Sequence, residues 1–298
     1  EMPNTADNPT RVADGTLLVL VQLCLGDRKL DYRDKPSDPP FSATNQSAFT
    51  MVVFRSVDEG RVWRFQGVVT DPRDYPESVE GTDSEMSLAQ LADNKTLTVI
   101  TRADGDCGCV PTARSAAPPG QITGGSYSAC GFYKYYYQTF STDLGRTWTK
   151  AKPMQGMGCV KPRLLTLGAN ESTPGPVLLS GGRLCVENKT DVRLWFSPDG
   201  MAGMKGHAPW QTHSLSEVHN KLWQGDPGYK FDLSEINNPK LFATQSYTTL
   251  IQTAPDEAIV AYNHYYHPND GSPGCLSDYP CDRFSVIHGL NHPPAVAG

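Results

Sequence analysis

A short β unit recurs along the chain, and this repeat limits the possible folds more than any other feature of the sequence. Each copy is a polar turn followed by a strand rich in Leu, Val, Ile or Thr, and helical periodicity is almost absent. The four clearest copies are residues 14–21, 94–101, 175–180 and 256–262. One β unit cannot bury both of its faces alone, so units repeating at about 50 residues must pack around a shared axis. We therefore predict an all-β propeller rather than a sandwich.

A turn with the pattern Ser-x-Asp-x-Gly marks the edge of this repeating unit. Residues 141–148 carry the full pattern S-T-D-L-G-R-T-W, residues 56–63 have Val in place of its Thr, and residues 197–200 are a shortened copy. In such a turn Ser and Asp bond to nearby backbone, Gly takes a positive φ, and Trp packs between sheets. Both full copies follow a β-rich run. We expect these turns on the outer rim of the propeller, in a structural and not a catalytic role.

The turns resemble the Asp boxes, or BNR repeats, of sialidases and trans-sialidases, whose fold is a six-bladed β-propeller. Asp boxes also occur in unrelated propellers, so the catalytic positions must be compared as well. The segment 84–102 begins S-E-M-S and ends in Arg, and it is similar to a sialidase strand pair that begins S-E-P-S. This resemblance implies that Glu85 polarises the nucleophile and that Arg102 binds the carboxylate of the substrate. The alternative is a carboxylate on the rim and a solvated Arg at a strand end.

Two later segments extend the resemblance. Arg193 stands on the strand that leads into the third turn, where sialidases have an Arg of their carboxylate-binding triad, although Arg183 on the preceding strand is a rival. The planar guanidinium of Arg matches a carboxylate with two parallel hydrogen bonds. The segment 245–262 resembles the closing sialidase motif and implies that Tyr247 is the nucleophile. A phenol suits this substrate because the carboxylate on the anomeric carbon of a sialoside would repel Asp or Glu.

Two sialidase elements have no convincing counterpart in the sequence. These are the first triad Arg, which belongs to an R-I-P motif, and the loop Asp that acts as acid and base. Asp7 stands where that Arg would precede Asn8-Pro, and nothing selects one carboxylate among Asp27, Asp31, Asp34 and Asp38. The position of the first turn relative to Glu85 matches the third blade of a sialidase. We therefore expect residues 1–298 to form one sialidase-like propeller domain that corresponds to blades three to six and lacks the first two blades.

The amino-acid composition indicates where the protein resides and excludes some classes of partner. The net charge is −6 and there is no basic run, which argues against nucleic-acid binding, and no apolar stretch approaches the roughly 18 residues of a membrane span. Eight cysteines and four N-x-S/T sequons, including that of Asn94, predict a disulfide-bonded glycoprotein that is secreted or at the cell surface. Cys275 and Cys281 are the expected local pair, and the remaining connectivity stays open. Cys107-Gly-Cys109 lacks a second ligand pair, so no metal or cofactor is expected.

The leading functional prediction is a retaining exo-α-sialidase or trans-sialidase that acts on terminal sialic acids or other acidic glycoconjugates. In that reading Tyr247 is the nucleophile, Glu85 is its general base, and Arg102 and Arg193 bind the carboxylate. The alternative is a non-catalytic module, a glycan-binding or structural propeller that keeps the fold without the chemistry. A third possibility is a glycosidase for another acidic sugar such as a uronate, with a carboxylate as its nucleophile.

Overall fold

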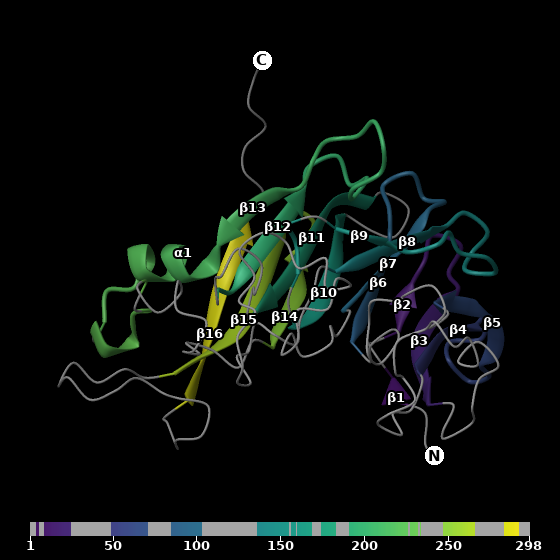
Figure 1. Ribbon diagram of the computed structural model, residues 1–298, viewed down its shortest axis with the longest axis horizontal. Coiled ribbons are helices and arrows are strands. Elements are labelled where there is room, and N and C mark those ends of the chain that lie inside the picture. The colour runs from purple at the N-terminus through teal and green to yellow at the C-terminus, as the bar shows by residue number, and fades with distance from the viewer. Residues whose placement is uncertain are drawn as a thin grey trace, which may run out of the picture.

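Four antiparallel sheets make up the part of the chain that the structure, a computed structural model, describes (Figure 1). The described residues are 4–5, 9–24, 49–70, 85–102, 136–154, 156–158, 160–168, 174–182, 191–225, 227–231, 233, 247–265 and 283–291. The sheets follow one another along the chain and lie side by side, from the first at the purple end to the fourth at the yellow end. This arrangement confirms the prediction of an all-β, sialidase-like propeller fold.

The first sheet consists of β1 (Asn4–Thr5), β2 (Thr10–Arg11), β3 (Leu17–Cys24), β4 (Phe49–Ser56) and β5 (Arg64–Thr70). The second sheet consists of β6 (Met86–Gln90), β7 (Leu97–Thr101), β8 (Tyr137–Ser141) and β9 (Lys152–Pro153). The third consists of β10 (Val160–Gly168), β11 (Pro174–Gly182), β12 (Arg193–Ser197) and β13 (Gln211–Ser214). The fourth consists of β14 (Thr248–Ala254), β15 (Glu257–Tyr265) and β16 (Arg283–Asn291). A helix, α1 (Leu215–Leu222), and a 3-10 turn, η6 (Pro227–Tyr229), follow β13.

Consecutive sheets pack face to face through apolar layers. Leu18 and Met51 of the first sheet meet Met86 and Val99 of the second in one buried cluster. A second cluster joins the second and third sheets through Ile100, Tyr136, Leu179 and Trp195. A third joins the third and fourth sheets through Leu178, Phe196, Val260 and Tyr262. Each sheet between two others is therefore buried on both faces, as stacked propeller blades require.

The first strands of the second, third and fourth sheets, β6, β10 and β14, lie next to one another as inner strands. Leu164 N donates to Ser87 Oγ at 2.9 Å and Thr166 Oγ1 donates to Gln90 O at 2.7 Å, so β6 and β10 run in the same direction. Gln252 Nε2 donates to Gly168 O at 2.6 Å and connects β14 to the end of β10. Because the inner strands run in the same direction, all of them begin at one end of the molecule, which we call the starting end.

The Ser-x-Asp-x-Gly turns lie between the last two strands of their sheets, on the side away from the inner strands. Ser141 Oγ accepts from Gly145 N at 2.9 Å, and Asp143 Oδ1 accepts from Thr147 N at 2.9 Å. Gly145 has φ +82°, a conformation that a residue with a Cβ adopts only at a cost. The turn at residues 56–63 repeats the same backbone bonds. Trp148 packs against the core between the first and second sheets.

Candidate active site

Glu85 and Arg102 meet at the starting end of the second sheet. Glu85 directly precedes β6 and Arg102 directly follows β7, and the pairing of Met86 with Thr101 brings the two residues side by side. Arg102 N donates to Glu85 O at 2.9 Å, and Arg102 Nη1 forms an ion pair with Glu85 Oε2. Their side chains are only 13% and 12% exposed. A charge-assisted bond in such a sheltered place is stronger than one between solvated groups.

Lys161 joins this pair to Tyr247, and sequence reasoning missed it. It lies at the start of β10, and its backbone N–H donates to Glu85 Oε2 at 2.8 Å. Its ammonium nitrogen lies 5.2 Å from the centroid of the Tyr247 ring, within the range of a cation–π contact. Lys161 also has φ +37°, and a left-handed conformation in a residue other than Gly is typical of functional sites. The available signal was its place at an inner-strand start, which matches that of Glu85.

Tyr247 precedes β14 and presents its side chain to solvent. It is 46% exposed, whereas the next residue, Thr248, is buried and shares a 2.7 Å hydrogen bond with Ser180 Oγ on β11. The anchored strand therefore fixes the backbone beside an accessible phenol. Tyr262, the other tyrosine of the 245–262 segment, is 1% exposed. Burial, and in second place the negative charge of Asp191, raise the pKa of Tyr262 above its usual value, so it stays neutral.

Arg193 begins β12 and makes its ion pair with a different partner. Its Nε lies 2.7 Å from Asp191 Oδ2, and the Asp191 side chain is 1% exposed. Burial raises the pKa of Asp191, while the charge of Arg193 and a hydrogen bond from Ser216 act in the opposite direction. The predicted site residues thus fall into two groups. Glu85, Arg102 and Tyr247 are connected through Lys161, and Arg193 is held by Asp191.

Several other sequence candidates lie outside the described residues. These are Arg183, the loop carboxylates Asp27, Asp31, Asp34 and Asp38, and the side chains of all eight cysteines. Asn94 is described, and it lies in the turn between β6 and β7. Among the described residues, no three His, Cys, Asp or Glu side chains come together as metal ligands. The described helices likewise include none with the length and apolar character of a membrane span.

Comparison with known proteins reveals similar structures but no matching sequence family. No family model and no curated protein matches the chain. A protein of unknown function from Dyadobacter fermentans has a similar structure, with a TM-score of 0.52, 13% identity, and coverage of 97% of this chain and 54% of that one. The chain thus spans about half the length of that relative.

Two solved glycosidases match with lower TM-scores. The intramolecular trans-sialidase of Ruminococcus gnavus has a TM-score of 0.44 and 15% identity, with coverage of 93% of this chain and 42% of that one. The GH93 α-L-arabinofuranosidase of Fusarium graminearum has a TM-score of 0.44 and 13% identity, with coverage of 96% and 62%. At such identities a likeness concerns the fold and not the activity. Neither match assigns an activity or a family to this chain, and the fold assignment rests on the four successive antiparallel sheets described above.

Proposed function

We propose that the protein is a sialidase-like glycosidase that removes or transfers terminal sialic acids by a retaining mechanism. The observation that carries the proposal is the connection at the starting end. Lys161 contacts both the Glu85–Arg102 ion pair and the exposed phenol of Tyr247. An accessible nucleophile, a carboxylate and two cations are the groups that a tyrosine-dependent glycosidase of acidic sugars needs.

Each of these groups has a role in the proposed reaction. Arg102 and Lys161 attract the carboxylate of the sialoside, and the charge of Lys161 also stabilises negative charge developing on the phenol. The oxygen of Tyr247 forms a bond to the anomeric carbon as the bond to the leaving oxygen breaks, and the phenolic proton passes to Glu85. An acid elsewhere protonates the leaving group. Water or an acceptor sugar then displaces Tyr247 from the glycosyl-enzyme, giving its proton to the conjugate base of that acid, while Glu85 returns the phenolic proton to Tyr247. The product keeps its configuration at the anomeric carbon.

The second candidate function is a non-catalytic, glycan-binding propeller. The ion pairs of both arginines, Arg193 with Asp191 and Arg102 with Glu85, favour it, because a guanidinium already held by a sheltered carboxylate is less able to clamp a substrate for turnover. The Glu85–Arg102 pair would then provide recognition without turnover. Binding of a sialylated glycan without hydrolysis or transfer is the property that distinguishes this function from the first.

The test measures release of a fluorogenic leaving group from an α-sialoside by the purified protein and by two matched variants. We expect Tyr247→Phe to lower kcat at least about a thousandfold while the fold is kept, because only the nucleophilic oxygen is removed. Tyr262→Phe makes the same chemical change at a buried site and should retain turnover. Full activity in Tyr247→Phe would refute the proposed nucleophile. Absence of turnover in the unmodified protein, together with sialyllactose binding that Arg102→Gln abolishes, would establish the glycan-binding function.

A further inference from the structure

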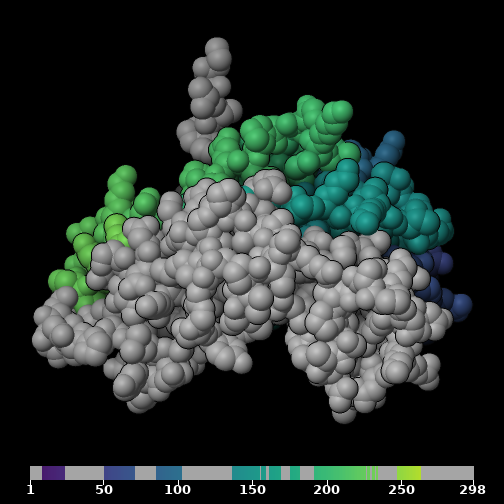
Figure 2. Space-filling model, viewed as in Figure 1, coloured from purple at the N-terminus to yellow at the C-terminus, as the bar shows by residue number. Residues whose placement is uncertain are grey.

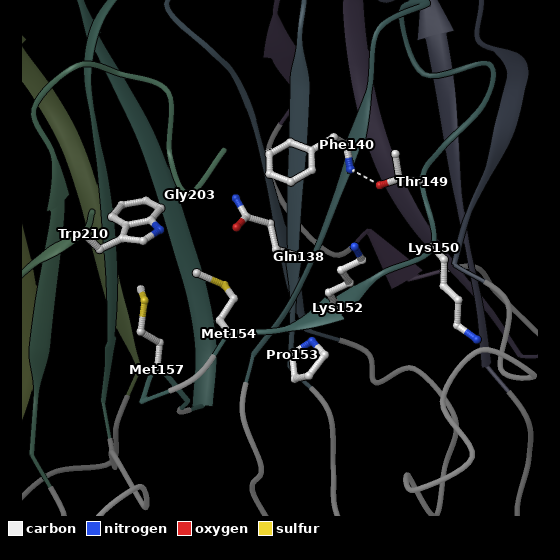
Figure 3. Close-up of a pocket in the computed structure, with 10 residues that line it drawn as sticks. All are labelled: Gln138, Phe140, Thr149, Lys150, Lys152, Pro153, Met154, Met157, Gly203 and Trp210. Atoms are coloured by element: carbon white, nitrogen blue, oxygen red, sulfur yellow. Dashed lines mark hydrogen bonds between the residues drawn. The ribbon is translucent and has the colours of Figure 1, made fainter. Parts of the chain in front are cut away.

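A pocket of about 440 Å³ lies between the second and third sheets, formed by their outer strands (Figure 3). One wall comes from β8, β9 and the residues after each strand, and the other from Gly203 and Trp210 in the connection between β12 and β13. In Figure 2 the green segment around residues 200–210 adjoins the teal segment around residues 140–155 on the upper surface. The volume suits a small ligand. None of the residues that connect Glu85 to Tyr247 lines the pocket.

The charge of this pocket selects anions. Lys150 and Lys152 both line it, and none of its described lining residues is acidic. Figure 3 shows the Lys152 ammonium group among the lining side chains, between Gln138 and Lys150. Lys152 forms no ion pair with another described residue. A positive pocket whose described lining contains no carboxylate attracts negatively charged ligands.

Beside Gly203 the pocket offers one hydrogen-bond acceptor and one donor. Gln138 is 7% exposed, and its Nε2 donates to Thr98 Oγ1 at 2.9 Å and to Ala202 O at 2.7 Å. Its Oε1 accepts no hydrogen bond from any described residue. The buried Nε1 of Trp210 likewise has no partner among the described residues. A buried donor without a partner costs about 1–3 kcal/mol, so the Trp210 N–H needs an explanation.

The gap between these two groups exists because residue 203 is Gly. A Cβ on Gly203 would lie 2.7 Å from Gln138 Oε1 and 3.1 Å from Trp210 Nε1. A hydroxyl group is the ligand chemistry that both can satisfy, since it donates to an amide oxygen and accepts from an indole N–H. Phe140, Met154 and Met157 add apolar surface that can cover the C–H face of a ring.

We propose that this pocket binds an acidic sugar, a hexuronate or sialate unit at the end of a glycan. The lysines recognise the carboxylate, the pair of Gln138 and Trp210 recognises a ring hydroxyl, and the apolar wall covers the ring. This site is separate from the proposed active site, and it does not depend on catalysis by Tyr247.

The test is a calorimetric titration with methyl glucuronide, with N-acetylneuraminic acid as a second acidic probe. Methyl glucoside lacks the carboxylate, and benzoate lacks the hydroxyls. We expect at least one acidic sugar to bind, with both control ligands at least about fivefold weaker. Lys152→Gln should weaken binding about fivefold because it removes one charge contact. Tyr247→Phe should bind the acidic sugar as well as the unmodified protein does.

Two glycine variants locate the binding site. The comparison is made in an Arg102→Gln background, which weakens carboxylate binding at the proposed active site. There Gly203→Ala fills the gap beside Gln138 and Trp210, and we expect it to abolish the remaining acid binding. Gly206→Ala is the matched control, because Gly203 and Gly206 have φ +81° and +90°, but a Cβ on Gly206 meets nothing within 4 Å. Both variants place a Cβ at a positive φ, and only the Cβ of Gly203→Ala meets other atoms. Equal affinity in both variants, equal affinity for methyl glucoside and methyl glucuronide, or no binding by either acid would overturn the proposal.

The outcomes are independent of those for the proposed function. Gly203→Ala and Lys152→Gln should turn over the fluorogenic α-sialoside at the rate of the unmodified protein. Acid binding that depends on Gly203 in a protein without turnover would support this pocket and reject the catalytic proposal. Turnover that depends on Tyr247, in a protein whose acid binding Gly203→Ala leaves unchanged, would support the catalytic proposal and reject this pocket.

Discussion

Replacement of Glu85 by Gln tests whether the ion pair at the starting end stabilises the fold. Breaking a buried pair by removing one partner costs about 3–5 kcal/mol, and slight exposure of both side chains reduces this to about 2–4 kcal/mol. The Lys161 N–H keeps an oxygen acceptor in the Gln variant, so the loss falls mainly on Arg102. At about 2–4 °C per kcal/mol for a chain of this size, the expected fall in Tm is about 4–16 °C.

The assay is thermal unfolding of the unmodified protein, Glu85→Gln, Arg102→Gln and the double variant, followed by circular dichroism. Since the two residues interact directly, the double variant should lose about 1–3 kcal/mol less than the sum of the single losses. Glu59→Gln is the control, because the pair of Arg11 and Glu59 is solvent-exposed, with side chains 36% and 70% accessible. It should leave Tm almost unchanged. Additive single losses, or an equal effect of Glu59→Gln, would refute the reasoning.

Two further predictions concern a turn and a buried tyrosine. Thr147→Val removes the 2.6 Å hydrogen bond from Thr147 Oγ1 to Asp143 Oδ2 and should lower the free energy of unfolding by about 1 kcal/mol, measured by thermal unfolding. Val62→Thr should add the equivalent bond to the first turn and raise Tm. A rise in Tm for Thr147→Val or a fall for Val62→Thr would contradict the shared turn geometry. The pKa of Tyr262 is raised in the folded protein. Its neutral phenol therefore contributes fully to the free energy of unfolding below about pH 10, and this contribution is lost at higher pH, where the same phenol ionises in the unfolded chain. Tyr262→Phe should therefore lose less stability than the unmodified protein between pH 8 and pH 10.5 in urea unfolding, and parallel losses would exclude this role.

The repeating unit of the fold could be predicted because it is local. Each of the four predicted β units overlaps the strand that pairs with the inner strand of its sheet, namely β3, β7, β11 or β15. A short run rich in Leu, Val, Ile or Thr after a polar turn specifies such a strand without reference to distant residues. The inner strands of the first sheet, β1 and β2, are two residues long and too short to show any periodicity. The helix α1 also escaped prediction, although Ser214 caps it by accepting from Glu217 N at 3.2 Å.

The candidate site was predictable where one hairpin creates it. Glu85 and Arg102 are 17 residues apart and flank adjacent strands, so their contact follows from the register of β6 and β7. Lys161 was not predictable in the same way. Its contacts with Glu85 and Tyr247 arise from the packing of inner strands that belong to three different sheets. Local patterns carry no information about such long-range neighbours.

The third Ser-x-Asp-x-Gly turn explains why the pocket occurs between the second and third sheets. In the turn at residues 141–148 the tryptophan follows at once, and Trp148 Nε1 donates to Gly145 O at 3.0 Å. The shortened turn at residues 197–200 keeps its Ser–Asp bond at 3.1 Å, but its tryptophan comes only at position 210. The longer connection carries Trp210 away from the turn glycine and leaves its N–H without a described partner. The repeat is therefore altered at the point where a buried donor without a described partner lies beside Gly203, as expected when stability is given up for ligand binding.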